Sequence, residues 1–294
     1  MASLNFSLLE EAMAVSRTAV RIAGEKILEV AASGNFGLEL KDDQSPVGRA
    51  DKLSNIELCT LLHTEFPDFG IVTEETINEA DLPSSSKLNL KSFNKALAEW
   101  QTREYCWYFD PLDGTKGFPD SVYGIHVGLT KEGKPVLGIN YYPKFDTLYS
   151  AITSMGAYQI TDKSSAPIRV SNAQNLQDAR PLLSKSHEDD IAQRFLRSEF
   201  KEATRVDSTG FKMCTVAQGG ADFYINFTQN LSLWDVCSGQ VVLGESRGKM
   251  TDCKGLPIDY RANSTMKLPC GIIVSNGIIH DALVEKARPF LPGQ

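Results

Sequence analysis

The chain has 294 residues, of which 42% are hydrophobic, and its formal net charge at neutral pH is −7. This length and apolar content suffice for a full hydrophobic core, built as one large domain or as two closely joined lobes. The acidic balance argues against a protein that binds a nucleic-acid backbone, and suits one that holds cations which attract an anionic substrate.

The cysteines and the N-terminus indicate the compartment. Six cysteines are scattered along the chain, with no C-x-x-C pair and no nearby histidine at metal-ligand spacing. This pattern is unlike a zinc site or a disulfide framework and predicts buried free thiols in a reducing compartment. The N-terminus lacks the basic start of a signal peptide, and no apolar stretch has the length of a membrane span. We therefore expect a cytoplasmic protein without a membrane partner.

The first half of the chain predicts helices followed by a sheet. Apolar residues recur at helical spacing from Leu8 to Ile27, which predicts a long amphipathic opening helix capped by Ser7. A Glu132-Gly133 turn is typical of a hairpin. In chain order, the further elements predicted are a helix over 51–66, a strand over 70–73, a polar surface loop over 78–91, and strands over 105–110, 123–130, 136–142, 147–153 and 157–160.

The second half alternates short strands with helices. The predicted strands cover 181–184, 223–227 and 271–275, and the predicted helices start at 188 or cover 212–218, 234–245 and 278–287. Helices with a sheet, followed by a second α/β unit, indicate alternating layers of helix and sheet.

The run from Trp107 to Phe118 (WYFDPLDGTKGF) is the most informative part of the sequence. An apolar, aromatic stretch ends in Asp110 and Asp113, as in a buried strand that delivers carboxylates to its carboxyl end. Two such aspartates repel unless a cation or a proton lies between them, and hard oxygen ligands favour Mg²⁺. The N–H groups of Gly114 and Thr115 offer a seat for phosphate. A bare Asp-Pro-x-Asp-Gly would be a surface turn, but the flanking residues favour the functional interpretation.

Three more acidic residues, two before this run and one after it, stand at the ends of predicted elements. Glu74 ends a predicted strand, Asp51 begins a helix, and Asp235 opens another. Taken alone, the two aspartates would be helix caps and Glu74 a solvated charge. Together with the run DPLDGT, their order and spacing resemble the inositol monophosphatase superfamily. The continuation Lys116-Gly117-Phe118 is most similar to its 3'(2'),5'-bisphosphate nucleotidase branch.

The resemblance implies an α+β or α/β fold, a layered α-β-α-β-α sandwich of the lithium-sensitive sugar-phosphatase type. It implies an N-terminal α+β lobe over 1–165 that carries most metal ligands. A C-terminal α/β lobe over 166–294 would carry Asp235 and the substrate pocket.

The resemblance also implies two or three Mg²⁺ ions per site. Glu74, Asp110 and the Leu112 carbonyl would bind the first ion. Asp110, Asp113 and Asp235 would bind a second, so that Asp110 bridges the two. These ions would lower the pKa of the attacking water and clamp the reacting oxygens.

Catalysis and phosphate binding are implied for neighbouring residues. Asp51 and Thr115 would form a hydrogen-bonded pair that orients the attacking water, because a threonine alone is too weak a base. The N–H groups of Gly114 and Thr115 would hold the phosphate. In-line attack then needs positioning and charge neutralisation rather than a covalent protein intermediate.

The substrate pocket is implied by two further stretches. The segment around Ser208, Thr209 and Lys212 resembles the family stretch that contacts the nucleotide, with the spacing favouring Thr209 for the hydroxyl. The same residues also fit a helix start capped by Ser208 or Thr209, with an exposed lysine. His187 matches a nucleotide-facing histidine and equally fits a solvated helix start. The other histidines, which show no partner pattern and are expected to be structural, are His63, His126 and His280.

Two positions depart from the family patterns. Asn226 stands where nucleotidases usually carry Arg and inositol monophosphatases carry Glu, and a neutral amide binds either substrate less strongly than a charge. Arg247 replaces a small residue and fits either a displaced phosphate ligand or a solvent-facing side chain.

The sequence therefore predicts a Mg²⁺-dependent phosphomonoesterase that hydrolyses the 3'-phosphate of adenosine 3',5'-bisphosphate to give AMP. The nearest alternative is an inositol monophosphatase or an inositol polyphosphate 1-phosphatase. An alternative of another class is an inactive regulator that binds metal or nucleotide. The expected partner is a small phosphorylated substrate, with no nucleic acid and no membrane, and the oligomeric state stays open.

Overall fold

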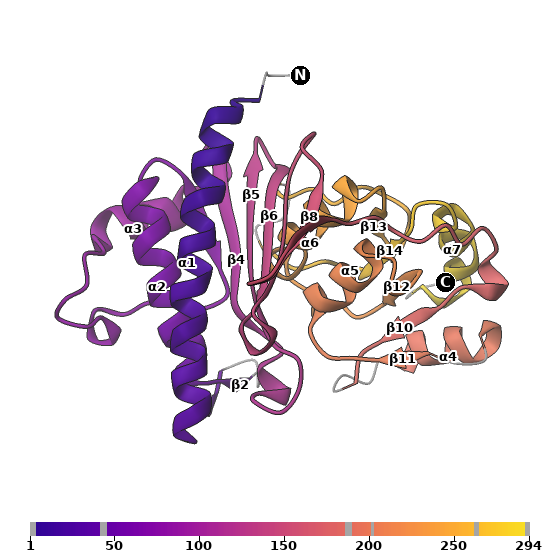
Figure 1. The fold of residues 1–294 in the computed structure, drawn as a ribbon, viewed down its shortest axis with the longest axis horizontal. Helices are drawn as coiled ribbons and strands as arrows, with labels where there is room; N and C mark the ends of the chain where they lie inside the picture. The colour runs from indigo at the N-terminus through magenta and orange to yellow at the C-terminus, as the bar shows by residue number, and fades with distance from the viewer. Residues whose placement is uncertain (1–3, 42–45, 186–189, 201–202, 262–264, 292–294) are drawn as a thin grey trace.

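The computed structural model describes residues 4–41, 46–185, 190–200, 203–261 and 265–291. Helices and sheets alternate in layers across the long axis of the molecule, which confirms the predicted α-β-α-β-α sandwich (Figure 1). The outer helices are α1 (Phe6–Ser33), α2 (Arg49–Glu65) and α3 (Leu90–Ala98), the central pair is α5 (Thr209–Ala217) and α6 (Leu233–Glu245), and the far layer holds α4 (Asp190–Glu199) and α7 (His280–Ala287).

The larger sheet has seven strands in chain order, with β3 and β4 parallel and every other neighbouring pair antiparallel. Glu132 and Gly133 both have positive φ, as the two central residues of the predicted hairpin turn require. Its strands are β3 (Gly70–Thr73), β4 (Tyr105–Asp113), β5 (Gly124–Lys131), β6 (Lys134–Tyr142), β7 (Thr147–Ile152), β8 (Ala157–Ile160) and β9 (Ser165–Pro167).

The smaller sheet has the order β11-β10-β12-β14-β13 and mixes parallel and antiparallel pairs. Its strands are β10 (Pro181–Leu183), β11 (Thr204–Arg205), β12 (Phe223–Asn226), β13 (Lys249–Asp252) and β14 (Ile272–Ser275). A separate two-stranded ribbon pairs β1 (Glu39–Leu40) with β2 (Pro46–Val47). The division of the chain into lobes at residue 165 stays a prediction.

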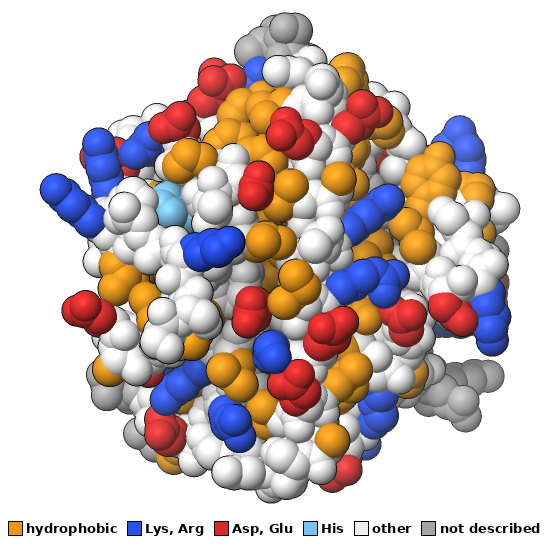
Figure 2. All heavy atoms as spheres, turned by 60° about the vertical axis from the view of Figure 1, so that its left-hand side comes forward, with side chains coloured by type: hydrophobic (Ala, Val, Ile, Leu, Met, Phe, Trp, Pro, Cys, Tyr) orange, Lys and Arg blue, Asp and Glu red, His pale blue; other side chains and the backbone are white. Residues whose placement is uncertain are grey.

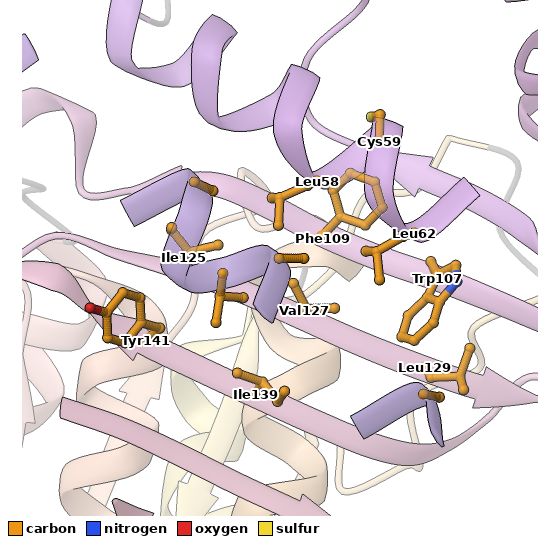
Figure 3. Close-up of a cluster of buried hydrophobic side chains, with 14 of the residues drawn as sticks. Leu58, Cys59, Leu62, Trp107, Phe109, Ile125, Val127, Leu129, Ile139 and Tyr141 are labelled. Carbon is orange, nitrogen blue, oxygen red and sulfur yellow. The ribbon is translucent and has the colours of Figure 1, made fainter. Parts of the chain in front are cut away.

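Strand β4 is buried on both faces, which explains its unbroken apolar run. Trp107 and Phe109 pack against Leu58 and Leu62 of α2 (Figure 3). Tyr108 points the other way, into the core shared with α6 and the smaller sheet. Because side chains alternate along a strand, the residue after Phe109 also points toward α6. This alternation carries the first carboxylate of the DPLD run to the side on which α6 begins.

Several predicted boundaries are wrong. Asn5, rather than Ser7, caps α1 through its side chain. The polar segment predicted as a loop over 78–91 leads into α3, which the sequence analysis missed, as it also missed β13. The strand predicted to end at residue 110 continues to Asp113 as β4, after a shift of register. Helix α5 begins at Thr209, before the predicted start at residue 212.

The surface and the cysteines agree with the composition. All six cysteines are buried and unbridged, as predicted. On the face of the molecule seen in Figure 2, acidic and basic side chains of the described residues are intermixed. Within the part of the chain that the structure describes, no helix is both long and apolar enough to cross a membrane.

Candidate metal centre

The irregular end of β4 places two aspartates side by side. Asp110 pairs with His126 of β5 and Asp113 pairs with Gly124, and the register shifts between these two pairs. The Leu112 N–H donates to Asp110 Oδ1 at 2.9 Å, which orients that carboxylate. The one extra residue of such a bulge re-aims the side chains on either side of it.

Gly114 lets the chain leave the strand directly after these aspartates. Its φ of +97° lies in the left-handed region that favours glycine. A Cβ at this position would lie 2.6 Å from the carbonyl oxygen of Val122, so a larger residue would also clash. After this turn, the Thr115 hydroxyl lies 2.9 Å from the carbonyl oxygen of Leu112, the residue between the two aspartates that precedes Asp113.

Two helix N-termini supply the next carboxylates. Asp51 is the third residue of α2, and its Oδ2 accepts a hydrogen bond of 2.8 Å from the Gly48 N–H. Asp235 is the third residue of α6, and its Oδ2 accepts one of 2.6 Å from the Ser232 N–H. Neither aspartate is the N-cap residue that the simpler interpretation expected. Each accepts the N–H of its capping residue through Oδ2, which is one half of a capping box, and leaves Oδ1 to face the site.

Glu74, Asp110 and Asp235 form a three-carboxylate cluster whose ligand atoms lie within 4.8 Å of one another. Burial is the main cause that raises the pKa values of Asp110 and Asp235, and the neighbouring carboxylates add to it. Three acidic groups this close repel strongly unless a cation neutralises them. The donor set is made of hard oxygen atoms, so it fits a divalent ion such as Mg²⁺.

Lys41 provides a positive charge at the edge of this cluster. Its Nζ lies 2.9 Å from Glu74 Oε1 and 2.5 Å from Glu75 Oε1. Burial lowers the pKa of Lys41, but its contacts with the two glutamates raise it overall. The lysine therefore stays charged and balances part of the acidic cluster, and it holds Glu74 in place beside Asp110.

Asp110 also belongs to a second group, the aspartate–histidine cluster of Asp110, Asp113 and His126, which meets the same 4.8 Å limit. Asp113 Oδ2 accepts hydrogen bonds from the Ser208 hydroxyl at 2.7 Å and from the Gly210 N–H at 3.0 Å. Asp110 belongs to both groups, and its role as a bridging ligand stays a prediction.

The structure groups the remaining residues differently from the sequence analysis. Asp235 lies with Glu74 and Asp110, whereas the resemblance had joined it to Asp110 and Asp113. His126, expected to be structural, lies 3.6 Å from Asp113 Oδ2 through its Nδ1. The only signal for it was its place on the strand that follows the DPLDGT run.

Thr115 and Asp51 form the predicted pair. The Thr115 hydroxyl lies 2.9 Å from Asp51 Oδ1. Burial raises the pKa of Asp51 to about 7, although hydrogen bonds from the Gly48 N–H and the Thr115 hydroxyl oppose the shift. A carboxylate with a pKa near neutrality is suited to accept a proton at physiological pH.

The start of α5 carries the predicted substrate residues. Ser208 caps α5 by accepting from the Phe211 N–H at 3.0 Å, and its hydroxyl also donates to Asp113. Thr209 is partly exposed, and its side chain forms a hydrogen bond with the side chain of Tyr224. Ser208 is therefore the helix cap and also bonds to Asp113 of the metal centre, while its contact with substrate stays a prediction. His187 lies outside the described residues.

Lys212 is buried rather than exposed. Its ammonium contacts the Ser184 hydroxyl at 3.2 Å and lies 4.9 Å from the centre of the Tyr224 ring. Burial lowers the pKa of Lys212 to about 8, against the opposing charges of Asp113 and Asp207. A buried ammonium without a carboxylate partner among the described residues favours the binding of an anion.

The two departures from the family patterns differ in position. Asn226 is buried and shares Tyr224 as a neighbour with this lysine: its Nδ2 donates to the Tyr224 hydroxyl at 3.1 Å, and its Oδ1 accepts from the Thr228 N–H at 2.7 Å. Arg247 is exposed and follows the C-terminal end of α6, one helix length from Asp235. It is therefore a solvent-facing residue and no phosphate ligand of this centre.

Comparisons with known proteins agree with this geometry. The sequence pattern of the inositol monophosphatase family matches residues 8–289. The 3'(2'),5'-bisphosphate nucleotidase CysQ of Escherichia coli K12 is 28% identical over 259 residues, which cover 85% of this chain and 94% of that protein. The fructose-1,6-bisphosphatase/inositol-1-monophosphatase of Aquifex aeolicus is 28% identical over 300 residues, which cover 96% and 97%.

A solved structure shows the same fold. The extragenic suppressor protein suhB of Bartonella henselae superposes with a TM-score of 0.75 at 24% identity, over 97% of this chain and 100% of that one. The match to the family extends over both sheets and includes every residue of the candidate metal centre. The chain belongs to the inositol monophosphatase family and is a phosphatase of that family.

Proposed function

We propose that this protein is a Mg²⁺-dependent phosphomonoesterase that hydrolyses the 3'-phosphate of adenosine 3',5'-bisphosphate to AMP and phosphate. One observation carries the proposal. The end of β4 holds both the three-carboxylate cluster, which suits a metal ion, and the Thr115–Asp51 hydrogen bond, which suits proton transfer. The similarity to CysQ and the Lys116-Gly117-Phe118 continuation support a nucleotide as the substrate.

The chain holds the metal through oxygen atoms that converge on one place. Glu74, Asp110 and Asp235 would provide one set of carboxylates, and Asp113 would extend it beyond Asp110. The Leu112 carbonyl, which lies 2.9 Å from the Thr115 hydroxyl, would complete the set around Glu74 and Asp110. Bound Mg²⁺ supplies a more acidic water and neutralises charge on the phosphate. Lys41 keeps Glu74 oriented throughout, because their charged contact does not depend on the substrate.

Thr115 and Asp51 handle the proton. A hydroxyl has one hydrogen, so Thr115 donates either to Asp51 Oδ1 or to the Leu112 carbonyl and keeps lone pairs for a water. When the water attacks the phosphorus, the bond from phosphorus to the ribose 3'-oxygen breaks. The water proton passes to Thr115 Oγ1 while the threonine proton passes to Asp51, and the leaving 3'-oxygen takes a proton from solvent. The N–H groups of Gly114 and Thr115 hold the phosphate in line, without a covalent protein intermediate.

Lys212 is the residue that we assign to the second phosphate. Its ammonium is buried beside Tyr224, and no carboxylate of the described residues pairs with it within salt-bridge distance. An anionic group of the substrate would repay the cost of that burial. Ser208 and Thr209 stand at the start of the helix that carries this lysine, and Ser208 bonds to Asp113. We assign these two residues to the same substrate pocket.

An inositol phosphate is the second candidate substrate. Asn226 weakens the case for a bisphosphate, because this neutral side chain is already bonded to Tyr224 and Thr228 and adds no positive charge for a second phosphate. It equally lacks the carboxylate that inositol monophosphatases carry at this position. The relative from Aquifex aeolicus, whose name includes inositol-1-monophosphatase, supports an inositol phosphate.

The test is phosphate release with Mg²⁺ from adenosine 3',5'-bisphosphate and from inositol 1-phosphate. We expect the parent protein to prefer the nucleotide. Lys212→Gln should lower kcat/KM for the nucleotide by about 10- to 100-fold and leave inositol 1-phosphate less affected. The control Lys95→Gln, on the exposed side of α3, should change neither.

Each other outcome points to one alternative. A parent protein that prefers inositol 1-phosphate would establish the inositol phosphatase. No phosphate release from either substrate, with Mg²⁺ bound, would favour the inactive regulator.

A further inference from the structure

His126 is a buried histidine whose two ring nitrogens lack hydrogen-bond partners among the described residues. It lies on β5, directly opposite Asp110, and its side chain is 0% exposed. Among the described residues, neither Nδ1 nor Nε2 has a hydrogen-bond partner. Leaving a buried polar atom unpaired costs about 1–3 kcal/mol, so native proteins rarely do so without a reason.

The group that faces this ring is the carboxylate of Asp113. The distance from His126 Nδ1 to Asp113 Oδ2 is 3.6 Å, which is too long for a hydrogen bond. Two donor atoms bound about 2.1 Å from the same ion, at angles of about 90–120°, lie roughly 3.0–3.6 Å apart. The separation therefore fits two ligands of one cation, with Asp110 as the third donor within 4.8 Å.

The surrounding residues fix both donors. A Cβ on Gly210 would lie 2.3 Å from His126 Cε1, so the first turn of α5 rests directly against the ring. Tyr142 meets the ring edge-on, at 6.2 Å between centroids. The Ser208 hydroxyl and the Gly210 N–H both donate to Asp113 Oδ2, the oxygen nearest His126. Such outer contacts orient metal ligands and raise their affinity.

We propose that His126 Nδ1 joins Asp110 and Asp113 as a ligand of a divalent cation, which gives one end of the metal centre a nitrogen donor. The inference rests on the proposed metal-dependent function. Carboxylates and carbonyls suit Mg²⁺, whereas imidazole suits Zn²⁺ and related transition ions. This end of the centre therefore binds Zn²⁺ more tightly than an all-oxygen site would, while the three-carboxylate cluster retains its match to Mg²⁺.

The first experiment measures metal affinity by calorimetry, without substrate, in the whole protein stripped with chelator. His126→Asn should weaken Zn²⁺ binding by at least about tenfold and change Mg²⁺ binding far less. The matched control is His280→Asn, a histidine that is also 0% exposed but bonded to Thr251 and Ser275. It should leave both affinities unchanged. Equal Zn²⁺ affinity in parent and His126→Asn would overturn the proposal.

The second experiment needs no variant. Mn²⁺ added to the stripped parent protein should show nitrogen coupling in its electron spin-echo spectrum, and labelling the histidines with ¹⁵N should change that coupling. The coupling should disappear in His126→Asn and persist in His280→Asn. A parent spectrum without nitrogen coupling would refute the assignment even if His126→Asn failed to fold. Because neither readout uses turnover, a wrong substrate assignment would leave both results intact.

Discussion

Helices α2 and α6 begin in the same way but deliver different chemistry. In each, an aspartate in the third helical position accepts the N–H of the capping residue, Gly48 for Asp51 and Ser232 for Asp235. This local arrangement satisfies a backbone group that a helix start otherwise leaves unpaired. It also aims the second carboxylate oxygen of each aspartate toward the end of β4.

What differs is the partner that each aspartate meets there. Asp51 meets the hydroxyl of Thr115, whereas Asp235 meets Glu74 and Asp110. The same helix start thus supplies a proton acceptor in one place and a metal ligand in the other. The local sequence at each helix start therefore orients the carboxylate, and the residues that this carboxylate contacts at the end of β4 determine its chemical role.

The largest predicted effect separates these two roles. Asparagine keeps an oxygen that accepts the capping N–H but removes the charge. Asp235→Asn should weaken Mg²⁺ binding, so that its lost activity partly returns at high Mg²⁺. Asp51→Asn should keep the parent Mg²⁺ affinity and lower kcat by about 10³-fold at every Mg²⁺ concentration. Calorimetry and kcat against Mg²⁺ concentration measure both. Rescue of Asp51→Asn by Mg²⁺ would show that the two aspartates share one role.

A smaller effect is expected at Thr115, the partner that distinguishes α2 from α6. Thr115→Ala should lower kcat by about 10²-fold with little change in KM, because the backbone N–H that holds phosphate remains. Thr115→Ser, which retains the hydroxyl, is the control and should stay near the parent. Combined with Asp51→Asn, Thr115→Ala should add little further loss, since the pair acts as a unit. Additive losses in kcat would contradict the pairing.

The sequence predicted the parts of this site that depend on local order. Asp110, Asp113 and Thr115 lie in one contiguous run, and the alternation along β4 already placed neighbouring side chains on opposite faces. Asp51 and Asp235 each begin a predicted helix, which alone would make them caps, and the family-like order and spacing of the whole acidic set marked them as site residues. The layered fold followed from the order of helices and strands, which local periodicity records well.

The parts that the sequence did not predict depend on register and burial. His126 faces Asp113 because β5 pairs with β4 across an irregular shift, and no residue in the connecting loop reveals that offset. The sequence left open whether Lys212 contacts the nucleotide or is an exposed lysine at a helix start. Its burial arises from packing against Tyr224 of β12 and the Val206 carbonyl, which the local sequence does not reveal. The role of Ser208 as both cap and Asp113 partner also required the packing of α5 against the larger sheet.

The smallest predicted effect concerns the stability of the metal-free protein. Burial raises the pKa of Asp51 from 3.8 to about 7, so the folded state binds a proton more tightly than the unfolded state does. Unfolding free energy should therefore fall as pH rises from about 4 to 7 in chelator, by roughly 3 kcal/mol from this residue. Asp51→Asn should reduce that slope, whereas the exposed control Asp120→Asn should retain it. Urea unfolding at several pH values measures the slope. An identical slope in Asp51→Asn and parent would mean that burial does not raise the pKa of Asp51 toward neutrality. That result would remove one reason for assigning Asp51 as the proton acceptor.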